Sequence, residues 1–93
     1  MNRTLLQTPS FARDMKRFLK RHSDLKEVLR ATLDLLSADA FDPLLKTHKL
    51  AGTLANSWAC SAGYDLRIIF EFVPRQDTDA IRLLALGTHD ELY

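Results

Sequence analysis

The chain has 93 residues, of which 46% are hydrophobic and 27% are charged, a composition typical of one small globular domain. No apolar run approaches the ~20 residues of a membrane span, and the apolar stretch near the N-terminus is too short for a secretory signal. A single cysteine, Cys60, excludes an internal disulfide and a zinc site built from cysteines. We therefore expect one cytoplasmic domain over residues 1–93, without a membrane partner.

The net charge of +1 is distributed unevenly along the chain. Residues 1–30 carry eight Lys and Arg against three Asp and Glu, whereas residues 31–93 carry five against nine. The basic first third offers a surface for phosphates, although a solvated helix face is the simpler interpretation. The modest total charge argues against tight, free-standing affinity for nucleic acid.

The first third of the chain predicts a short strand followed by two helices. Residues 3–7 form the strand candidate, and Thr8 and Pro9 are suited to the N-cap and first position of a helix. Ser23 or Asp24 is expected to cap a second helix, with Glu27 completing a capping box on Asp24. Each helix has an apolar stripe at helical spacing, formed by Phe11, Met15, Phe18 and Leu19 in the first and by Leu25, Val28, Leu29, Thr32, Leu35 and Leu36 in the second. The tight connection predicts an antiparallel hairpin of helices packed on one face of a sheet.

The rest of the chain predicts a loop and then strands. Residues 37–46 are expected to form a loop anchored by Leu44 and Leu45, and residues 50–56 a short strand or bend. Residues 58–60 and 66–72 indicate a β-hairpin turning at Gly63, and the apolar residues 80–86 indicate a buried inner strand. The fold class is therefore α+β, with two helices on one face of a small, mostly antiparallel sheet.

Several ordered motifs in this sequence resemble the RelE/YafQ group of toxins, within the RelE/ParE superfamily. They are His48-Lys49-Leu50-x-Gly52, Trp58-x-Cys60, Gly63-Tyr64-Asp65-x-Arg67-Ile68-Ile69-Phe70 and Gly87-Thr88-His89-Asp90-Glu91-Leu92-Tyr93. The resemblance covers nearly the whole chain and implies a RelE-like fold. It also implies the toxin half of a type II toxin–antitoxin pair that cleaves mRNA, with ribosome association.

The resemblance implies a catalytic set at His48, Asp65, His89 and Tyr93, all of which match the YafQ branch in type. Metal-free RNA cleavage needs a base for the 2′-hydroxyl and an acid for the leaving 5′ oxygen, roles that suit histidine. Positive charge for the phosphate is available from Lys46, Lys49, Arg67 and Arg82. Tyr93 could stack on a base or donate its hydroxyl. We expect neither a cofactor nor a metal site.

The sequence departs from the YafQ branch at three positions and leaves simpler interpretations open. Ser61 replaces a histidine, Leu66 a tryptophan and Ala85 an arginine, which puts the rate and the cleavage preference in question.

Taken alone, each histidine could be an ordinary surface residue and Asp65 a turn residue, while Arg67 could pair with Glu71. Trp58 would then be a packing residue and Cys60 a buried, inert thiol.

The expected partners are a cognate antitoxin and mRNA on the ribosome, with DNA contacted only indirectly through the antitoxin complex. The alternative is a non-enzymatic toxin of ParE type that poisons DNA gyrase, or a degenerate toxin that acts mainly through its antitoxin complex.

Overall fold

The computed structural model describes residues 2–52, 56–63 and 65–92. Its elements follow the chain as β1 (Leu5–Gln7), α1 (Pro9–Arg21), the 3₁₀ turn η1 (Ser23–Leu25), α2 (Lys26–Ala38), the 3₁₀ turn η2 (Pro43–Leu45), β2 (His48–Lys49), β3 (Trp58–Ala62), β4 (Leu66–Val73), β5 (Ala80–Gly87) and α3 (His89–Leu92). Among the described residues, none of the helices is both long and apolar enough to cross a membrane.

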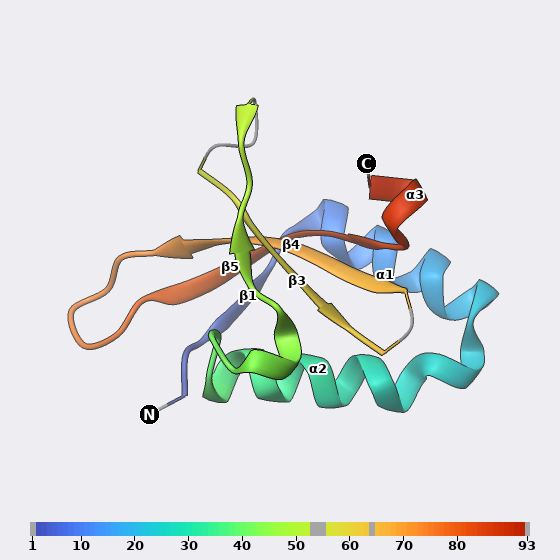
Figure 1. Cartoon of the computed structure of the whole chain (residues 1–93), viewed down its shortest axis with the longest axis horizontal. Coiled ribbons are helices and arrows are strands. Elements are labelled where there is room, and N and C mark those ends of the chain that lie inside the picture. The colour runs from blue at the N-terminus through green and yellow to red at the C-terminus, as the bar shows by residue number, and fades with distance from the viewer. Residues whose placement is uncertain (1, 53–55, 64, 93) are drawn as a thin grey trace.

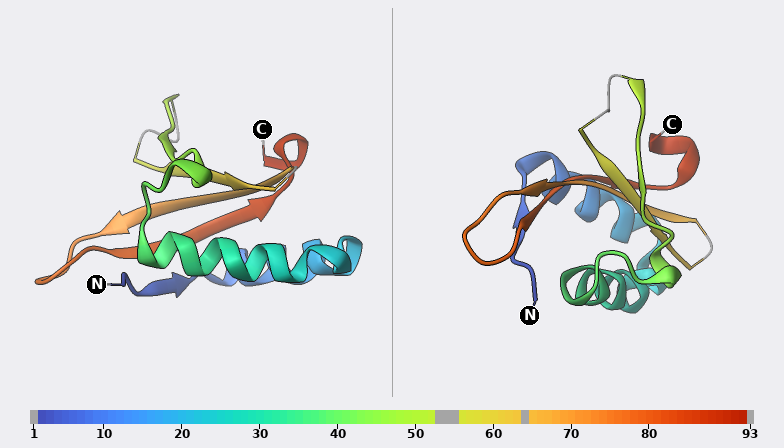
Figure 2. Two further views of the ribbon diagram at one scale, coloured as in Figure 1. Left: turned by 60° about the horizontal axis from the view of Figure 1, so that its bottom comes forward. Right: turned by 60° about the vertical axis from the view of Figure 1, so that its left-hand side comes forward.

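The five strands form one sheet in the order β1-β5-β4-β3-β2. Within the described residues, β1 and β5 pair in parallel, and the other neighbouring strands are antiparallel. Helices α1 and α2 lie on the same face of this sheet, whereas β2 and α3 project on the other side (Figures 1 and 2). The arrangement confirms the predicted α+β class, the two-helix layer and the position of residues 80–86 in an inner strand.

The hydrophobic core lies between the sheet and the two helices. Alternate residues of β4 point into it, and the same face of the sheet receives apolar side chains from both helices. The core residues that are less than 5% exposed include Phe11, Phe18, Leu29, Leu36, Leu66, Ile68, Phe70, Ile81, Leu83 and Leu86. This burial confirms the helix stripes and the predicted inward face of the hairpin strand.

A bulge in β5 changes which of its residues point into the core. Phe70 is opposite Leu83 but Ile69 is opposite Ala85, so Leu84 has no partner in the β4 register. Because an extra residue shifts the alternation by one, Leu83 and Leu86 both face the core although they are three positions apart.

Helix α1 begins directly after the short strand β1, which pairs with β5. The Thr8 backbone N–H and hydroxyl both donate to the Leu83 carbonyl, at 3.3 and 2.8 Å, and Asp14 accepts the Leu86 N–H at 3.1 Å. Thr8, the N-cap of α1, therefore continues the contact of β1 with β5, and the Asp14 side chain satisfies the Leu86 N–H near the strand end that leads into α3.

Some local predictions are confirmed and others are wrong. Thr8 caps α1 by accepting the Phe11 N–H at 3.1 Å, and Pro9 occupies the first turn as expected. The predicted capping box on Asp24 is wrong, because residues 23–25 form a 3₁₀ turn and α2 begins without a side-chain cap. Leu45 is buried as predicted, but Leu44 is 77% exposed because the η2 turn directs it away from the core.

The short strand before the hairpin lies earlier than predicted. It covers His48–Lys49 rather than residues 50–56, since these two residues find partners on β3 at Ala59 and Trp58. The expectation of a bend falls partly on residues 53–55, which lie outside the described part of the chain.

Candidate active site

The face of the sheet opposite α1 and α2 carries most of the predicted site residues. Its residues line up in rows across the strands: His48 is opposite Ala59, Ala59 opposite Ile69, and Ile69 opposite Ala85. A second row joins Ser61, Arg67 and Gly87. Because paired residues point to the same side of a sheet, His48 and Arg67 share the face that the helices leave uncovered.

His48 is exposed on the edge strand β2, and its ring orientation is fixed by one hydrogen bond. Its Nδ1 lies 3.0 Å from the carbonyl oxygen of Lys46. A carbonyl oxygen can only accept, so Nδ1 carries the hydrogen and the neutral ring presents a lone pair at Nε2. Lys46 reaches this geometry with φ of 51°, the left-handed region, at the end of η2. In this tautomer Nε2 is the acceptor nitrogen of the ring.

Asp65 and His89 are brought together although 24 residues separate them. The Asp65 Oδ1 accepts the backbone N–H of His89 at 3.2 Å, at the first residue of α3. The His89 side chain is 61% exposed, and its Nδ1 lies 3.7 Å from an oxygen of Asp90. Asp65 thus connects the start of β4 to the helix that carries His89.

Helix α3 itself was not predicted from the sequence. The sequence pattern that indicates this helix is Thr88-x-x-Glu91, a capping box. The Glu91 side chain accepts the Thr88 N–H at 2.8 Å, and the Thr88 hydroxyl accepts the Glu91 N–H at 3.3 Å. Glu91 and Thr88 therefore belong to the residues that shape the site, and sequence reasoning missed both roles.

Arg67 lies between two small residues in its row, Ser61 on β3 and Gly87 on β5. It is half-buried, and its Nη1 donates to the Leu66 carbonyl at 3.2 Å. Leu66, the third departure from the YafQ branch, lies on the opposite face and is 1% exposed. Ser61 and Ala85, by contrast, lie on the face of the candidate site.

The remaining basic candidates are more dispersed. Arg82 forms an ion pair with Glu71, its neighbour on β4, and this replaces the alternative pairing of Glu71 with Arg67. Arg82 is five residues before Gly87, about 17 Å along an extended strand, so the structure separates it from Asp65 and His89. Lys49 is exposed beside His48, opposite Trp58. The predicted role of Tyr93 falls outside the described residues.

The ionisation states in and near the site have identifiable causes. Burial raises the pKa of the Cys60 thiol to about 12, so Cys60 is the inert buried residue that the sequence suggested. The hydrogen bond from the Thr88 backbone lowers the pKa of Glu91, with further lowering by the Thr88 hydroxyl and by the nearby Arg21 and His22. Within residues 2–52, 56–63 and 65–92, His, Cys, Asp and Glu side chains do not gather in groups of three that could hold a metal.

Comparison with known proteins identifies the family. A family model described as "Bacterial toxin of type II toxin-antitoxin system, YafQ" matches residues 3–93. No curated protein sequence matches the chain.

Solved structures agree with this match. The crystal structure of YafQ from E. coli strain BL21(DE3) has a TM-score of 0.77 at 22% identity and covers 98% of both chains. The toxin in the E. coli DinJ–YafQ toxin–antitoxin complex has a TM-score of 0.75 at 23% identity, covering 100% of this chain and 99% of that one. A metal-bound toxin from Helicobacter pylori has a TM-score of 0.71 at 27% identity, covering both chains completely. With its RelE-like fold and a family match over almost its full length, the chain belongs to the YafQ family of bacterial type II toxin–antitoxin toxins.

Proposed function

We propose that this toxin is an endoribonuclease that cleaves mRNA held on the ribosome by metal-independent acid–base chemistry. The observation that carries the proposal is the hydrogen bond from the His89 backbone to Asp65. It holds an exposed histidine at the end of β5, near the row of Arg67, on the face of the sheet that also carries His48. RNA cleavage through the 2′-hydroxyl requires a base, an acid and positive charge, and this face carries two histidines and an arginine that can supply them.

The two histidines take different roles in this mechanism. His48, with its hydrogen at Nδ1 toward Lys46, accepts the 2′-hydroxyl proton at Nε2, which frees the oxygen to attack the adjacent phosphate. His89 protonates the leaving 5′ oxygen as the phosphorus–oxygen bond breaks. The products are a 2′,3′-cyclic phosphate and a 5′-hydroxyl. Asp65 acts by orienting α3, and Tyr93 contacts the base or the phosphate.

Positive charge for the phosphorane comes first from Arg67, whose row ends at Gly87, two residues before His89. Lys46 and Lys49 lie close to His48 in sequence. Lys49 pairs with Trp58 in the row of Phe70, so it points to the opposite side of the sheet from His48 and reaches the phosphate only around the edge strand β2. Arg67 offsets in part the loss of the family's histidine and arginine at Ser61 and Ala85. Arg82 contributes least, because it is paired with Glu71 at a distance from the histidines.

The proposed partners follow from the family. The E. coli relative forms a complex with the antitoxin DinJ, and we propose that a cognate antitoxin likewise holds this toxin inactive. The net charge of only +1 fits a toxin that depends on the ribosome to present the mRNA.

The test is to map mRNA 5′ ends by primer extension after brief expression of the wild type and of His89→Ala in cells. Discrete cuts in translated regions that disappear in the variant are the expected result. Retained binding of His89→Ala to the antitoxin provides the control for folding. Cuts of equal strength in both strains, or none from a folded wild type, would contradict the proposal and turn attention to gyrase.

A further inference from the structure

The helix that carries His89 is too short to hold its own position. Helix α3 spans four residues, His89–Leu92, whereas isolated helices shorter than about 12–15 residues are marginal in water. Its placement therefore depends on contacts with the rest of the domain. One of these is the hydrogen bond from the His89 N–H to the Asp65 carboxylate already described.

The Glu91 carboxylate makes two further polar contacts. One oxygen accepts the Thr88 N–H at 2.8 Å, and the second lies 3.2 Å from Nη1 of Arg21. Because His89 lies between Thr88 and Glu91, the first contact stabilises the backbone turn that contains His89. The second contact ties α3 to the last residue of α1, 70 positions away in the sequence.

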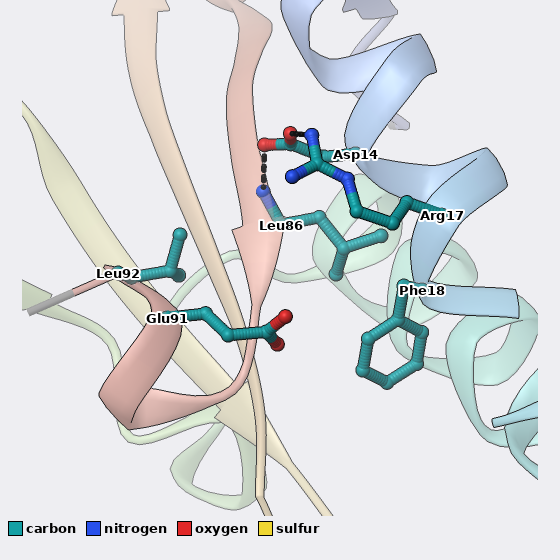
Figure 3. A pocket seen from close by; sticks show the side chains of 6 residues that line it. All are labelled: Asp14, Arg17, Phe18, Leu86, Glu91 and Leu92. Carbon is teal, nitrogen blue, oxygen red and sulfur yellow. Dashed lines mark hydrogen bonds and ion pairs between the residues drawn. The ribbon is translucent and has the colours of Figure 1, made fainter. Parts of the chain in front are cut away.

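The pocket beneath α3 shows how Glu91 bridges two elements. Its volume is about 80 Å³, and it is lined by Asp14, Arg17, Phe18, Leu86, Glu91 and Leu92. Figure 3 shows the Glu91 side chain extending from α3 toward α1 across this pocket, while Asp14 contacts both Arg17 and the Leu86 backbone. Helix α3 thus lies over a small cavity whose lining combines the charged side chains of Asp14, Arg17 and Glu91 with the apolar ones of Phe18, Leu86 and Leu92.

Gly87 provides the space in which Glu91 lies. A Cβ atom at position 87 would be 3.2 Å from the Glu91 Cβ and 3.3 Å from its Oε1. Both distances are shorter than ordinary van der Waals contacts between such atoms. Because Gly87 has no side chain, the Glu91 side chain of α3 can lie against the end of β5.

We infer that Glu91 is a positioning residue for the ribonuclease reaction: through Thr88 and Arg21 it holds α3 in the orientation that presents His89 to the RNA. The inference rests on the proposed function, since it assigns His89 a task. Glu91 acts through the helix and does not itself touch the substrate. Its loss is expected to lower kcat and leave KM for RNA unchanged.

The experiment compares four variants with the wild type. Glu91→Ala removes both contacts, whereas Glu91→Gln keeps an oxygen for the Thr88 N–H and loses only the charge opposite Arg21. Arg21→Gln removes the same ion pair from the other side. Glu27→Gln, an exposed carboxylate in the first turn of α2, is the matched control.

Two readouts are measured for each variant. The first is the NMR order parameter of the His89 amide, expected to fall from about 0.85 toward 0.6 in Glu91→Ala and to take intermediate values in the two Gln variants. The second is RNA cleavage, where kcat should fall about 10-fold in Glu91→Ala and less in Glu91→Gln, because misplacement of a reacting group is costly. Glu27→Gln should match the wild type in both.

The outcomes separate this inference from the proposed function. An unchanged order parameter at His89 in Glu91→Ala would overturn the inference, whether or not the protein cleaves RNA. A reduced order parameter with full cleavage by the variant would overturn it as well. Absence of cleavage by the folded wild type would instead refute the proposed function, while the order parameters still decide whether Glu91 holds α3.

Discussion

Different interactions hold the side chains on the two faces of the sheet in place. On the helix face, side chains such as Phe70 and Ile68 are fully buried among many apolar neighbours. On the opposite face, the exposed His48 donates to the Lys46 carbonyl, and the backbone N–H of the exposed His89 donates to Asp65. The helix face therefore carries most of the apolar burial that stabilises the fold, and the opposite face carries the candidate site. Substitutions on the two faces should separate stability from activity.

The largest effect on stability is expected on the helix face. Phe70→Ala leaves a cavity in the core and should lower the free energy of unfolding by about 3–5 kcal/mol. His48→Ala, on the exposed face, should change it by less than about 0.5 kcal/mol. Urea denaturation of both variants measures the contrast, and similar losses in the two would show that the faces are not energetically distinct.

A second contrast lies within the exposed face, between its two arginines. Arg67→Gln should lower the cleavage rate by about 10-fold or more, the value of a lost charged hydrogen bond. Arg82→Gln should change it by less than about 2-fold, because Arg82 is paired with Glu71. Single-turnover cleavage rates for both variants provide the comparison. A larger effect at Arg82 would place the RNA across the other end of the sheet.

The pH dependence of α3 should follow the ionisation of Glu91. Its pKa is lowered in the folded protein, chiefly by the Thr88 backbone, so its contribution to stability is complete above the ordinary glutamate pKa of about 4.3 and is lost as the pH falls through the lowered value. The His89 amide order parameter should therefore be constant near neutral pH and decrease only in acid. Glu91→Gln should abolish this acid transition, and its persistence in that variant would assign it to other carboxylates.

The smallest effect is expected for Lys46→Gly, which removes the Lys46 side chain but allows the same backbone conformation. Glycine adopts the left-handed conformation of this residue without strain but is more flexible when unfolded, and these effects nearly cancel. Lys46→Gly should thus change the unfolding free energy by less than about 0.5 kcal/mol. Its cleavage rate reports only the lost ammonium group, with Lys49→Ala as the comparison at a neighbouring basic position. A large loss of stability would instead assign the Lys46 side chain a structural role.

The sequence predicted the helix face better than the exposed face. Periodic stripes such as Phe11–Phe18 and Leu66–Phe70 follow directly from the geometry of helices and strands, so the layers and most of the core were predictable. The bulge at Leu84 was not, because nothing in a continuous apolar run marks the residue that loses its partner. Leu44 illustrates the same difficulty, since its apolar character gives no sign of exposure.

The candidate site was predictable as a set of residues but not as an arrangement. The motifs pointed to His48, Asp65 and His89, yet only the fold shows that the Asp65 carboxylate meets the His89 backbone. The contact between Arg21 and Glu91 joins α1 to α3 and has no local signal in the sequence. Pairings of this kind depend on tertiary packing, which spacing along the chain does not encode.

The central claim, acid–base cleavage by the exposed face, is tested most directly with a single chemical change in the substrate. The wild-type toxin would be given an mRNA bound to ribosomes, intact or with one 2′-deoxy nucleotide at the cleavage site, and the ends of the products determined. The account predicts a 2′,3′-cyclic phosphate and a 5′-hydroxyl from the intact mRNA, and no cleavage at the deoxy position. Undiminished cleavage of the deoxy substrate would contradict it, because no 2′-hydroxyl would then be available to attack the phosphate.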